Sequence, residues 1–229
     1  MQTLQDKLHA LGEWYHRIDL GGGIITPGDR NQSLTYALYE RFLPRDLTGL
    51  TVLDLGANAC GLSIEFAKRG ASVTAIERAD AAIAQARFVL DHFGLADRVT
   101  IHNADAHEMT RFGQFDIVAC VGLVYHLRHP QLALDQLGHV TKSHLLVSTQ
   151  TTPGDALTLT SRGAKRSGFS ATWEPTEPAF EGMLVSAGFR NVELVSTKPH
   201  AGESPGNILG NRSYFYAKPF KRVELPHLY

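Results

Sequence analysis

Cysteine, net charge and long apolar segments are all scarce in this sequence of 229 residues. The two cysteines, Cys60 and Cys120, predict buried reduced thiols rather than a disulfide framework, which favours a reducing, cytoplasmic compartment. No apolar run is long enough to span a bilayer, and residues 1–14 lack the apolar core of a signal peptide. We therefore expect neither membrane insertion nor export.

The formal net charge is only −1, so no overall attraction to nucleic acid is expected. Two local groups of basic residues are present, Arg162, Lys165 and Arg166 in one, and Arg212, Lys218, Lys221 and Arg222 in the other. Solvated basic loops explain both groups, and a continuous RNA-binding surface is the alternative. Histidine and cysteine nowhere cluster with metal-ligand spacing, so no metal is expected.

From residue 51 onward, strand and helix patterns alternate along the chain. Strands are expected at residues 51–55, 72–76, 99–103, 115–121 and 144–149. Amphipathic segments at residues 62–68, at 132–140 and after Asp80, a potential N-cap, predict helices between them. Such alternation predicts right-handed βαβ units and a parallel sheet. A helix at 177–187 and strands at 192–195 and 214–217, with no helix between the two strands, predict an antiparallel pair at the end.

The first 48 residues have a different pattern. Leu4, Leu8, Leu11 and Tyr15 recur at steps of three and four, which predicts an amphipathic helix that ends at the glycines of 21–23. A second helix is expected at about 33–42, so residues 1–48 are interpreted as a helical cap or lid. Residues 49–229 form the core of a single α/β domain, a mostly parallel seven-stranded Rossmann-like sheet with an antiparallel C-terminal strand.

The sequence VLDLGANACG at residues 52–61 takes a strand through a glycine turn into a helix, the nucleotide-binding corner of Rossmann-like folds. A dinucleotide fingerprint would need its middle glycine at Asn58, where the side chain hinders the approach of a pyrophosphate. Asp54 adds a carboxylate, which repels a pyrophosphate and attracts the ammonium of a methionine moiety. Asp54, Gly56 and Asn58 therefore predict S-adenosylmethionine (SAM) rather than NAD.

Further cofactor contacts are predicted at the ends of the next strands. Glu77, an acid about 20 residues after the loop, is suited to bind the ribose hydroxyls, and a solvated strand-end charge is the alternative. Arg78 is assigned to adenine or to the surface. Asp105, followed by the small Ala106, is assigned to the adenine amino group or to a turn. Val121, which ends the fourth strand, completes the predicted cofactor site.

Together these segments resemble the motifs of class I SAM-dependent methyltransferases. The matching segments are DLG at 54–56, Glu77, NADA at 103–106, FDIV at 115–118 and LVSAGFRNVE at 184–193. The resemblance covers about residues 50–218 and implies a Rossmann-like methyltransferase that uses SAM. Cys60 departs from the pattern, because glycine is usual there, and predicts a locally altered turn.

A narrower resemblance is to short members of the tRNA wobble-uridine carboxymethyl/methyltransferase-like family. It rests on VGLVYHLRHP at 121–130, KRGA at 68–71, WYHRIDL at 14–20 and NR at 211–212. In the carboxymethylating members a Lys, a Tyr and an Arg hold the extra carboxylate of carboxy-SAM, and the resemblance assigns Tyr125 and Arg212 to two of these roles. Residues 19–28, where the lysine would lie, contain none. Plain SAM is therefore favoured over carboxy-SAM.

Candidate catalytic residues follow the fourth strand. We interpret His126 as a general base, because imidazole titrates near neutral pH, with a purely structural histidine as the alternative. Tyr125 is either catalytic or orients the acceptor. His129 and Arg212 are assigned to acceptor binding, Arg212 to an anionic group or to a strand-edge salt bridge.

The N-terminal segment is expected to contribute Tyr15 and His16, next to Trp14, to a lid over the site, or else to pack on the sheet. The expected acceptor is a small molecule, and a tRNA wobble uridine is the alternative. The oligomeric state is left open by the sequence, a homodimer included.

Overall fold

The computed structural model describes residues 3–161, 173–199 and 211–220. It contains two compact units, Met1–Glu108 and Met109–Tyr229. The basic residues at 162, 165, 166, 221 and 222 lie outside the described residues.

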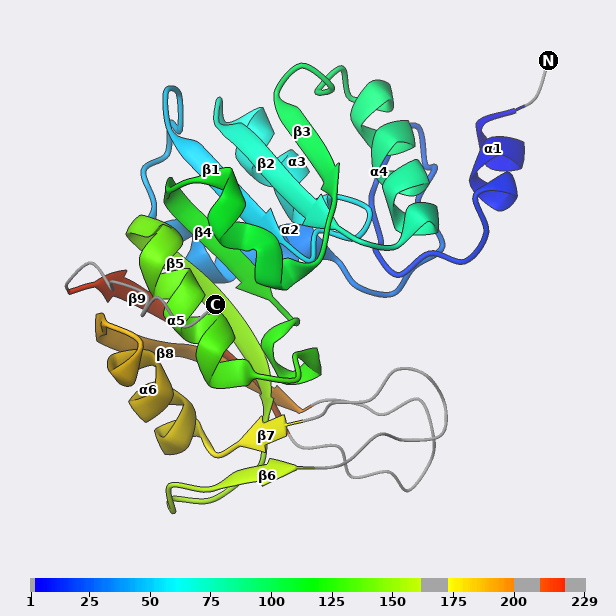
Figure 1. Ribbon diagram of the computed structural model, residues 1–229. Helices are drawn as coiled ribbons and strands as arrows, with labels where there is room; N and C mark the ends of the chain where they lie inside the picture. The colour runs from blue at the N-terminus through cyan, green and yellow to red at the C-terminus, as the bar shows by residue number, and fades with distance from the viewer. Residues whose placement is uncertain (1–2, 162–172, 200–210, 221–229) are drawn as a thin grey trace. The chain divides into compact units, whose positions relative to one another are not determined.

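The first unit contains a parallel sheet with the order β3-β2-β1 (Figure 1). Its strands are β1 (Thr51–Leu55), β2 (Ser72–Glu77) and β3 (Val99–Asn103), and its crossover helices are α3 (Gly61–Lys68) and α4 (Asp80–His92). The core includes Leu53, Ile64, Phe66 and Ile76, all buried. Burial of each such side chain contributes about 1.5–3 kcal/mol. The sheet therefore holds the carboxyl ends of its three strands at one edge.

The N-terminal segment differs from the prediction. Helix α1 covers only Leu4–Ala10, because Gly12 adopts a positive φ of 78° directly after the C-cap. Tyr15 is 43% exposed and lies in a loop rather than on a buried helical face. The long amphipathic helix was therefore a wrong prediction. The second helix is confirmed as α2 (Gln32–Tyr39) followed by the 3₁₀-helix η1 (Glu40–Phe42).

The second unit contains four strands in the order β4-β5-β9-β8. These are β4 (Phe115–Val121), β5 (Thr141–Thr151), β8 (Phe189–Pro199) and β9 (Asn211–Pro219). Strands β4 and β5 are parallel, whereas β9 runs antiparallel to both β5 and β8. Helices α5 (Pro130–Val140) and α6 (Glu177–Ser186) pack on this sheet. The 3₁₀-helix η2 (Ala106–Phe112) lies where the two units join in sequence, and η3 (Val124–His126) follows β4.

Two short strands were not predicted. Strands β6 (Leu159–Ser161) and β7 (Trp173–Pro175) form a separate antiparallel pair, visible in yellow-green and yellow in Figure 1. β7 contacts β5, α6 and η3. This pair thus extends the second unit beyond the end of β5, beside the turn that follows β4.

The strands confirm the predicted α/β class: β1, β2 and β3 are parallel in the first unit, β4 and β5 are parallel in the second, and the C-terminal strand β9 is antiparallel to β5. Over the described residues, none of the helices has both the length and the apolar character needed to cross a membrane.

Candidate functional site

The glycine loop after β1 is held in shape by backbone hydrogen bonds. The N–H groups of Gly56 and Ala57 both donate to the carbonyl of Ile76, at 2.9 and 3.1 Å. Gly56 has a φ of 75°, and Asn58 and Cys60 also adopt positive φ values of 48° and 56°. A non-glycine residue rarely adopts this conformation, and cysteine less readily than asparagine. The turn at Cys60 therefore keeps a glycine-like backbone although the glycine is missing.

Asp54 lies buried at the end of β1. Its Oδ2 accepts a hydrogen bond of 2.6 Å from the Ser63 hydroxyl, one turn into α3. Burial raises the pKa of Asp54 to about 6, and the bond from Ser63 only partly opposes this. A carboxylate that is costly to ionise in this position is stabilised by a cation. Ser63 is a partner that the motif analysis missed, since nothing in a helical Ser marks it.

Glu77 connects the end of β2 to the glycine loop and to α4. Its Oε2 accepts from the Asn58 N–H at 2.9 Å, and its Oε1 accepts from the N–H groups of Arg78 and Ala79 at 2.8 and 2.9 Å. A carboxylate offers about four acceptor positions. Three are thus occupied by backbone, so binding of two ribose hydroxyls requires exchange of at least one of these bonds.

The remaining predicted adenine contacts lie at the end of β3. Arg78 Nη1 is 3.8 Å from Asp105 Oδ2, and the Arg78 side chain is largely exposed. Asp105 Oδ1 accepts from the His107 N–H at 2.9 Å, which fixes the turn into η2. Ala106 begins that turn and is half-buried. Asp80 does not cap α4 as predicted, since Ala79 is the N-cap and Asp80 Oδ1 instead accepts from Asn103 Nδ2.

His16 packs directly against the start of α3. The Gly61 N–H donates to His16 Nδ1 at 3.3 Å, and a Cβ on Gly61 would approach that nitrogen to 3.0 Å. The other ring nitrogen of His16, Nε2, lies 3.0 Å from Gln32 Nε2, so Gln32 also holds the ring in place. Burial lowers the pKa of His16 to about 4. His16 is therefore a neutral support of the glycine loop, while Tyr15 faces solvent beside Arg30.

In the second unit, the structure brings Tyr125 and Arg212 together. Arg212 Nη2 on β9 donates to the Tyr125 hydroxyl on η3, and the guanidinium carbon lies 5.3 Å from the Tyr125 ring centre. Both side chains are buried, Arg212 with 8% exposure. A Cβ on Gly122 would reach Arg212 Nη1 at 3.0 Å, so the glycine leaves room for the guanidinium. Buried arginine in this form is suited to bind an anionic or polar group.

His126 is exposed, and its ring lies 4.1 Å from that of Tyr125, centre to centre. His129 is exposed and forms the N-cap of α5. Val121 ends β4 and is half-buried. The roles assigned to these three residues stay predictions.

Two buried polar side chains next to Arg212 were missed by sequence reasoning. Gln150 pairs with Arg212 across β5 and β9, and Ser148 lies two residues earlier on the same face of β5. Ser148 Oγ and Gln150 Oε1 are buried and have no hydrogen-bond partner among the described residues. Buried polar atoms are normally paired, so this face of the sheet offers bonds to a ligand. Within the described ranges, no group of three or more His, Cys, Asp or Glu is placed to hold a metal. Cys60 and Cys120 are buried and reduced, as predicted.

Comparison with known proteins identifies the family. Residues 29–194, well over half of the chain, match the profile of the family described as "Methyltransferase domain". A ubiquinone biosynthesis O-methyltransferase of Azoarcus sp. is 33% identical over 96 residues, 42% of this chain and 41% of that protein. The matched region thus spans less than half of that curated relative. The narrower resemblance to tRNA wobble-uridine enzymes stays a prediction.

Solved structures show the same fold. The N-terminal domain of EvdMO1, crystallised in the presence of S-adenosylhomocysteine (SAH) and D-fucose, has a TM-score of 0.72 at 21% identity, with 95% of this chain and 96% of that chain covered. The 1,6-didemethyltoxoflavin-N1-methyltransferase of Burkholderia thailandensis has a TM-score of 0.61 at 17% identity over 83% of this chain and 78% of that one. The chain belongs to the family of class I SAM-dependent methyltransferases.

Proposed function

We propose that this chain transfers the methyl group of SAM to a small-molecule acceptor. The observation that carries the proposal is the pair of acids at the glycine loop. Asp54 and Glu77 end neighbouring parallel strands, and their register partners Ala75 and Asn103 place both ends at one sheet edge. Ligands of open α/β sheets bind at this edge. Two carboxylates there suit a ligand that carries an ammonium and ribose hydroxyls, and they repel a diphosphate.

The residues that would bind SAM are those whose geometry fits its parts. Asp54 is the partner for positive charge, because burial raises its pKa and a neighbouring cation would stabilise its ionised form. Glu77 binds the ribose through the acceptor position that the backbone leaves open. Asp105 and Arg78 close the adenine end, and Val121 adds an apolar contact. When bound, SAM supplies an electrophilic methyl on its sulfonium.

The chain's contribution to methyl transfer is positioning and proton removal. Alignment of a bound nucleophile is worth an effective molarity of about 10⁵–10⁸ M. We assign Tyr125, Arg212 and Gln150 to hold the polar part of the acceptor, because they form a buried polar group on η3, β9 and β5. His126 accepts the proton of a hydroxyl acceptor, which adds about 10²–10⁴-fold.

Calorimetric titration tests the cofactor assignment. SAM and SAH should bind with one site per chain, and NADH should not bind. Binding of NADH without binding of SAM would overturn the proposal. Mass spectrometry of ligands that co-purify with the protein then distinguishes SAM from carboxy-SAM and identifies the acceptor.

The small-molecule acceptor is favoured by the relatives, since the names of two of them give small-molecule methylation as their activity. Titration with tRNA at low salt tests the alternative. Binding that weakens steeply as salt rises would favour a tRNA acceptor. Absence of binding would leave the small molecule as the acceptor.

A further inference from the structure

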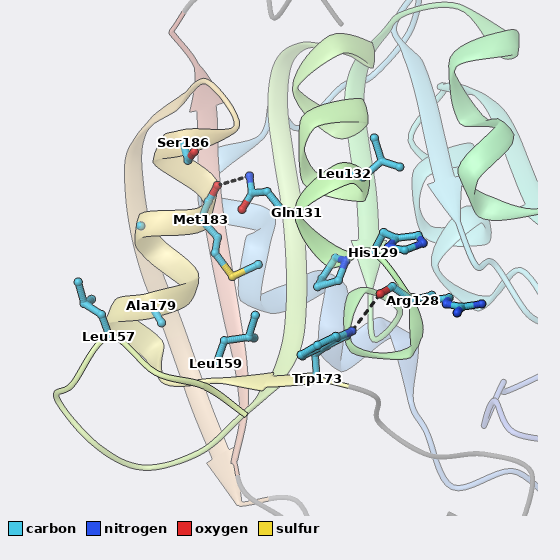
Figure 2. A pocket seen from close by; sticks show the side chains of 12 residues that line it. Arg128, His129, Gln131, Leu132, Leu157, Leu159, Trp173, Ala179, Met183 and Ser186 are labelled. Atoms are coloured by element: carbon cyan, nitrogen blue, oxygen red, sulfur yellow. Dashed lines mark hydrogen bonds between the residues drawn. The ribbon is translucent and has the colours of Figure 1, made fainter. Parts of the chain in front are cut away.

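The second unit contains a cavity of about 860 Å³ whose lining residues, His129 apart, have no role in the reaction assigned above. Figure 2 shows it between the start of α5, the residues around β6, strand β7 and helix α6. Its volume lies within the range of roughly 300–1,000 Å³ that is typical of small-molecule sites. The residues that line it are Arg128, His129, Pro130, Gln131, Leu132, Leu157, Leu159, Trp173, Ala179, Gly182, Met183 and Ser186.

The walls of the cavity are apolar and partly exposed. Leu157 is 80% exposed and Leu159 is 41% exposed, and both lie on the wall opposite Arg128 in Figure 2. Scattered exposed leucines need no explanation, but these two share one hollow with Met183 and Trp173. The Trp173 ring is held in place, because its Nε1 donates to the Arg128 carbonyl at 3.1 Å. The hollow thus presents a fixed aromatic ring and exposed aliphatic side chains to one ligand.

Gly182 is a second, independent sign that the space is kept open. It lies in the middle of α6, where glycine destabilises a helix relative to alanine. Its φ is not positive, and a Cβ built there would meet no atom within 4 Å. Neither backbone conformation nor close packing therefore requires glycine at this position. What glycine does provide is additional volume in the cavity that it lines.

One end of the cavity carries the positive charge of the Arg128 guanidinium. Arg128 and His129 are exposed there, and no ion pair of Arg128 occurs among the described residues. The Gln131 amide is already used, because it donates to Asp135 Oδ1 at 3.0 Å and to the Met183 carbonyl at 3.3 Å. An acidic group on a ligand would therefore meet Arg128 and His129 rather than an amide.

The cavity adjoins the turn that carries the candidate catalytic residues. Arg128 follows His126 by two positions, and β7 contacts η3. A ligand in the cavity would thus extend away from Tyr125 and His126 along the second unit.

We propose that this cavity binds the apolar portion of the acceptor, an aromatic ring system or hydrocarbon chain, with an acidic group of the same molecule at Arg128 and His129. The proposal rests on the proposed function, since it identifies the class of acceptor as an amphiphilic acid. The occupant is a small molecule, because the hollow is lined by side chains of one unit and ends at the Arg128 guanidinium and the His129 imidazole.

The probe is anilinonaphthalene sulfonate, which joins fused aromatic rings to an anion and fluoresces in apolar surroundings. The test variant is Gly182→Leu, which places four carbons in the cavity without a clash at Cβ. The matched control is Glu181→Leu, the same new side chain on the adjacent exposed position of α6, outside the cavity lining. We expect saturable binding to the parent chain and to Glu181→Leu, and at least tenfold weaker binding to Gly182→Leu.

Arg128 and Trp173 provide separate readouts. Arg128→Gln should weaken the sulfonate probe severalfold but leave its neutral analogue N-phenylnaphthylamine unchanged. Trp173→Phe should reduce the probe emission that is sensitised by tryptophan, because Trp173 is the tryptophan that lines the cavity. Equal probe affinity in Gly182→Leu and Glu181→Leu would overturn the proposal.

A folding control and a SAM titration separate the two hypotheses. A melting temperature of Gly182→Leu at or above that of the parent chain shows that the helix is intact. If the melting temperature is lower, probe binding is measured instead with Gly182→Met and Met183→Gln, and the same loss of probe affinity is expected. If SAM binds all variants and none loses the probe, the cavity proposal fails and the methyltransferase assignment stands. If the probe behaves as expected but SAM does not bind, the assigned reaction fails instead.

Discussion

The glycine loop of the first unit and the cavity of the second unit are built in opposite ways. In the loop, the Asn58 N–H donates to Glu77, the N–H groups of Gly56 and Ala57 donate to the Ile76 carbonyl, and the backbone has positive φ at Asn58 and Cys60. In the cavity, apolar side chains stand exposed and a helix carries a glycine that its backbone does not need. Backbone thus defines one site, and side chains define the other.

This difference has a physical reason. A cofactor with fixed hydrogen-bonding groups is bound by a backbone of fixed geometry, and few substitutions preserve such geometry. An apolar ligand needs only area and volume, which many side chains supply. The loop therefore carries what the chain shares with its family, and the cavity is where the acceptor of this particular chain would be selected.

The largest effect is expected in the loop, from Glu77→Gln. The variant keeps the side-chain volume but loses the charge and one acceptor oxygen. Charge-assisted hydrogen bonds contribute roughly 1.5–3 kcal/mol each, so SAM affinity should fall by about a hundredfold. Calorimetry measures this, with Asp91→Asn on the exposed side of α4 as the control. An unchanged affinity would exclude the acid from the cofactor site.

The pH dependence of the free energy of unfolding tests whether His16 supports the glycine loop as a neutral imidazole. The pKa of His16 is about 4 in the fold against an ordinary 6.5, so the stability it contributes is present above pH 6.5 and lost as pH falls toward 4. At pH 5 the loss is roughly 2 kcal/mol. The stability difference between the parent and His16→Asn, which keeps an acceptor for Gly61, should narrow by that amount between pH 7.5 and pH 5. Denaturant unfolding at both pH values measures this stability difference. The titration of Asp54 contributes equally to both proteins and therefore does not affect the difference. A difference that does not change with pH would contradict a buried neutral imidazole.

A smaller effect is expected from His126→Ala on the acceptor side. Turnover should fall at least tenfold, or about 1.4 kcal/mol in the barrier, while SAM affinity stays unchanged. Formation of SAH with the identified acceptor measures turnover. His9→Ala, an exposed histidine of α1, is the control. Normal turnover would remove His126 from the mechanism.

The smallest effect is expected from Gly182→Ala in α6. Alanine should raise the free energy of unfolding by about 0.5–1 kcal/mol, because glycine costs that much in a helix interior. Thermal and denaturant melts measure the gain. The result complements that of Gly182→Leu. A substitution that stabilises the fold but weakens probe binding would mean that Gly182 keeps the cavity open and thereby lowers the stability of α6. Destabilisation by alanine would instead mean that the glycine has a structural role.

Local patterns were sufficient for the strands of the sheet. Strands β1, β3 and β4 have the bounds predicted. For β1 and β4 the reason is that buried parallel strands are nearly continuous apolar runs, whereas β3 is largely half-buried or exposed. The predicted length of the N-terminal helix was wrong because the spacing of Leu11 and Tyr15 matches a helical repeat although neither residue is helical. The positive φ of Gly12 ends the helix, and the hydrogen bond from Trp14 Nε1 to the Leu8 carbonyl holds the chain after it against the helix. Strands β6 and β7 have three residues each, too few for a periodic signal.

The same distinction holds for the site. Asp54, Gly56, Asn58 and Glu77 lie in a contiguous motif or at a fixed spacing, so the sequence indicates them. Ser63, Ser148 and Gln150 acquire a role only through tertiary contacts, across a helix turn or a strand pair. The cavity is lined by residues between 128 and 186 that share no sequence pattern. From the sequence alone, Gly182 is one of many glycines that helices tolerate, and only the structure shows that its missing side chain leaves space in the cavity.

The position of Glu77 also means that the ligand state of the loop can be followed from the start of α4. The same carboxylate that would bind a ribose now holds the amide hydrogens of Arg78 and Ala79, and Ala79 is the N-cap of that helix. A ribose that draws Oε1 away would release these two amides to solvent, while the Asn58 amide on Oε2 would stay protected. Hydrogen–deuterium exchange at three backbone positions would then report occupancy without any label, substrate or turnover.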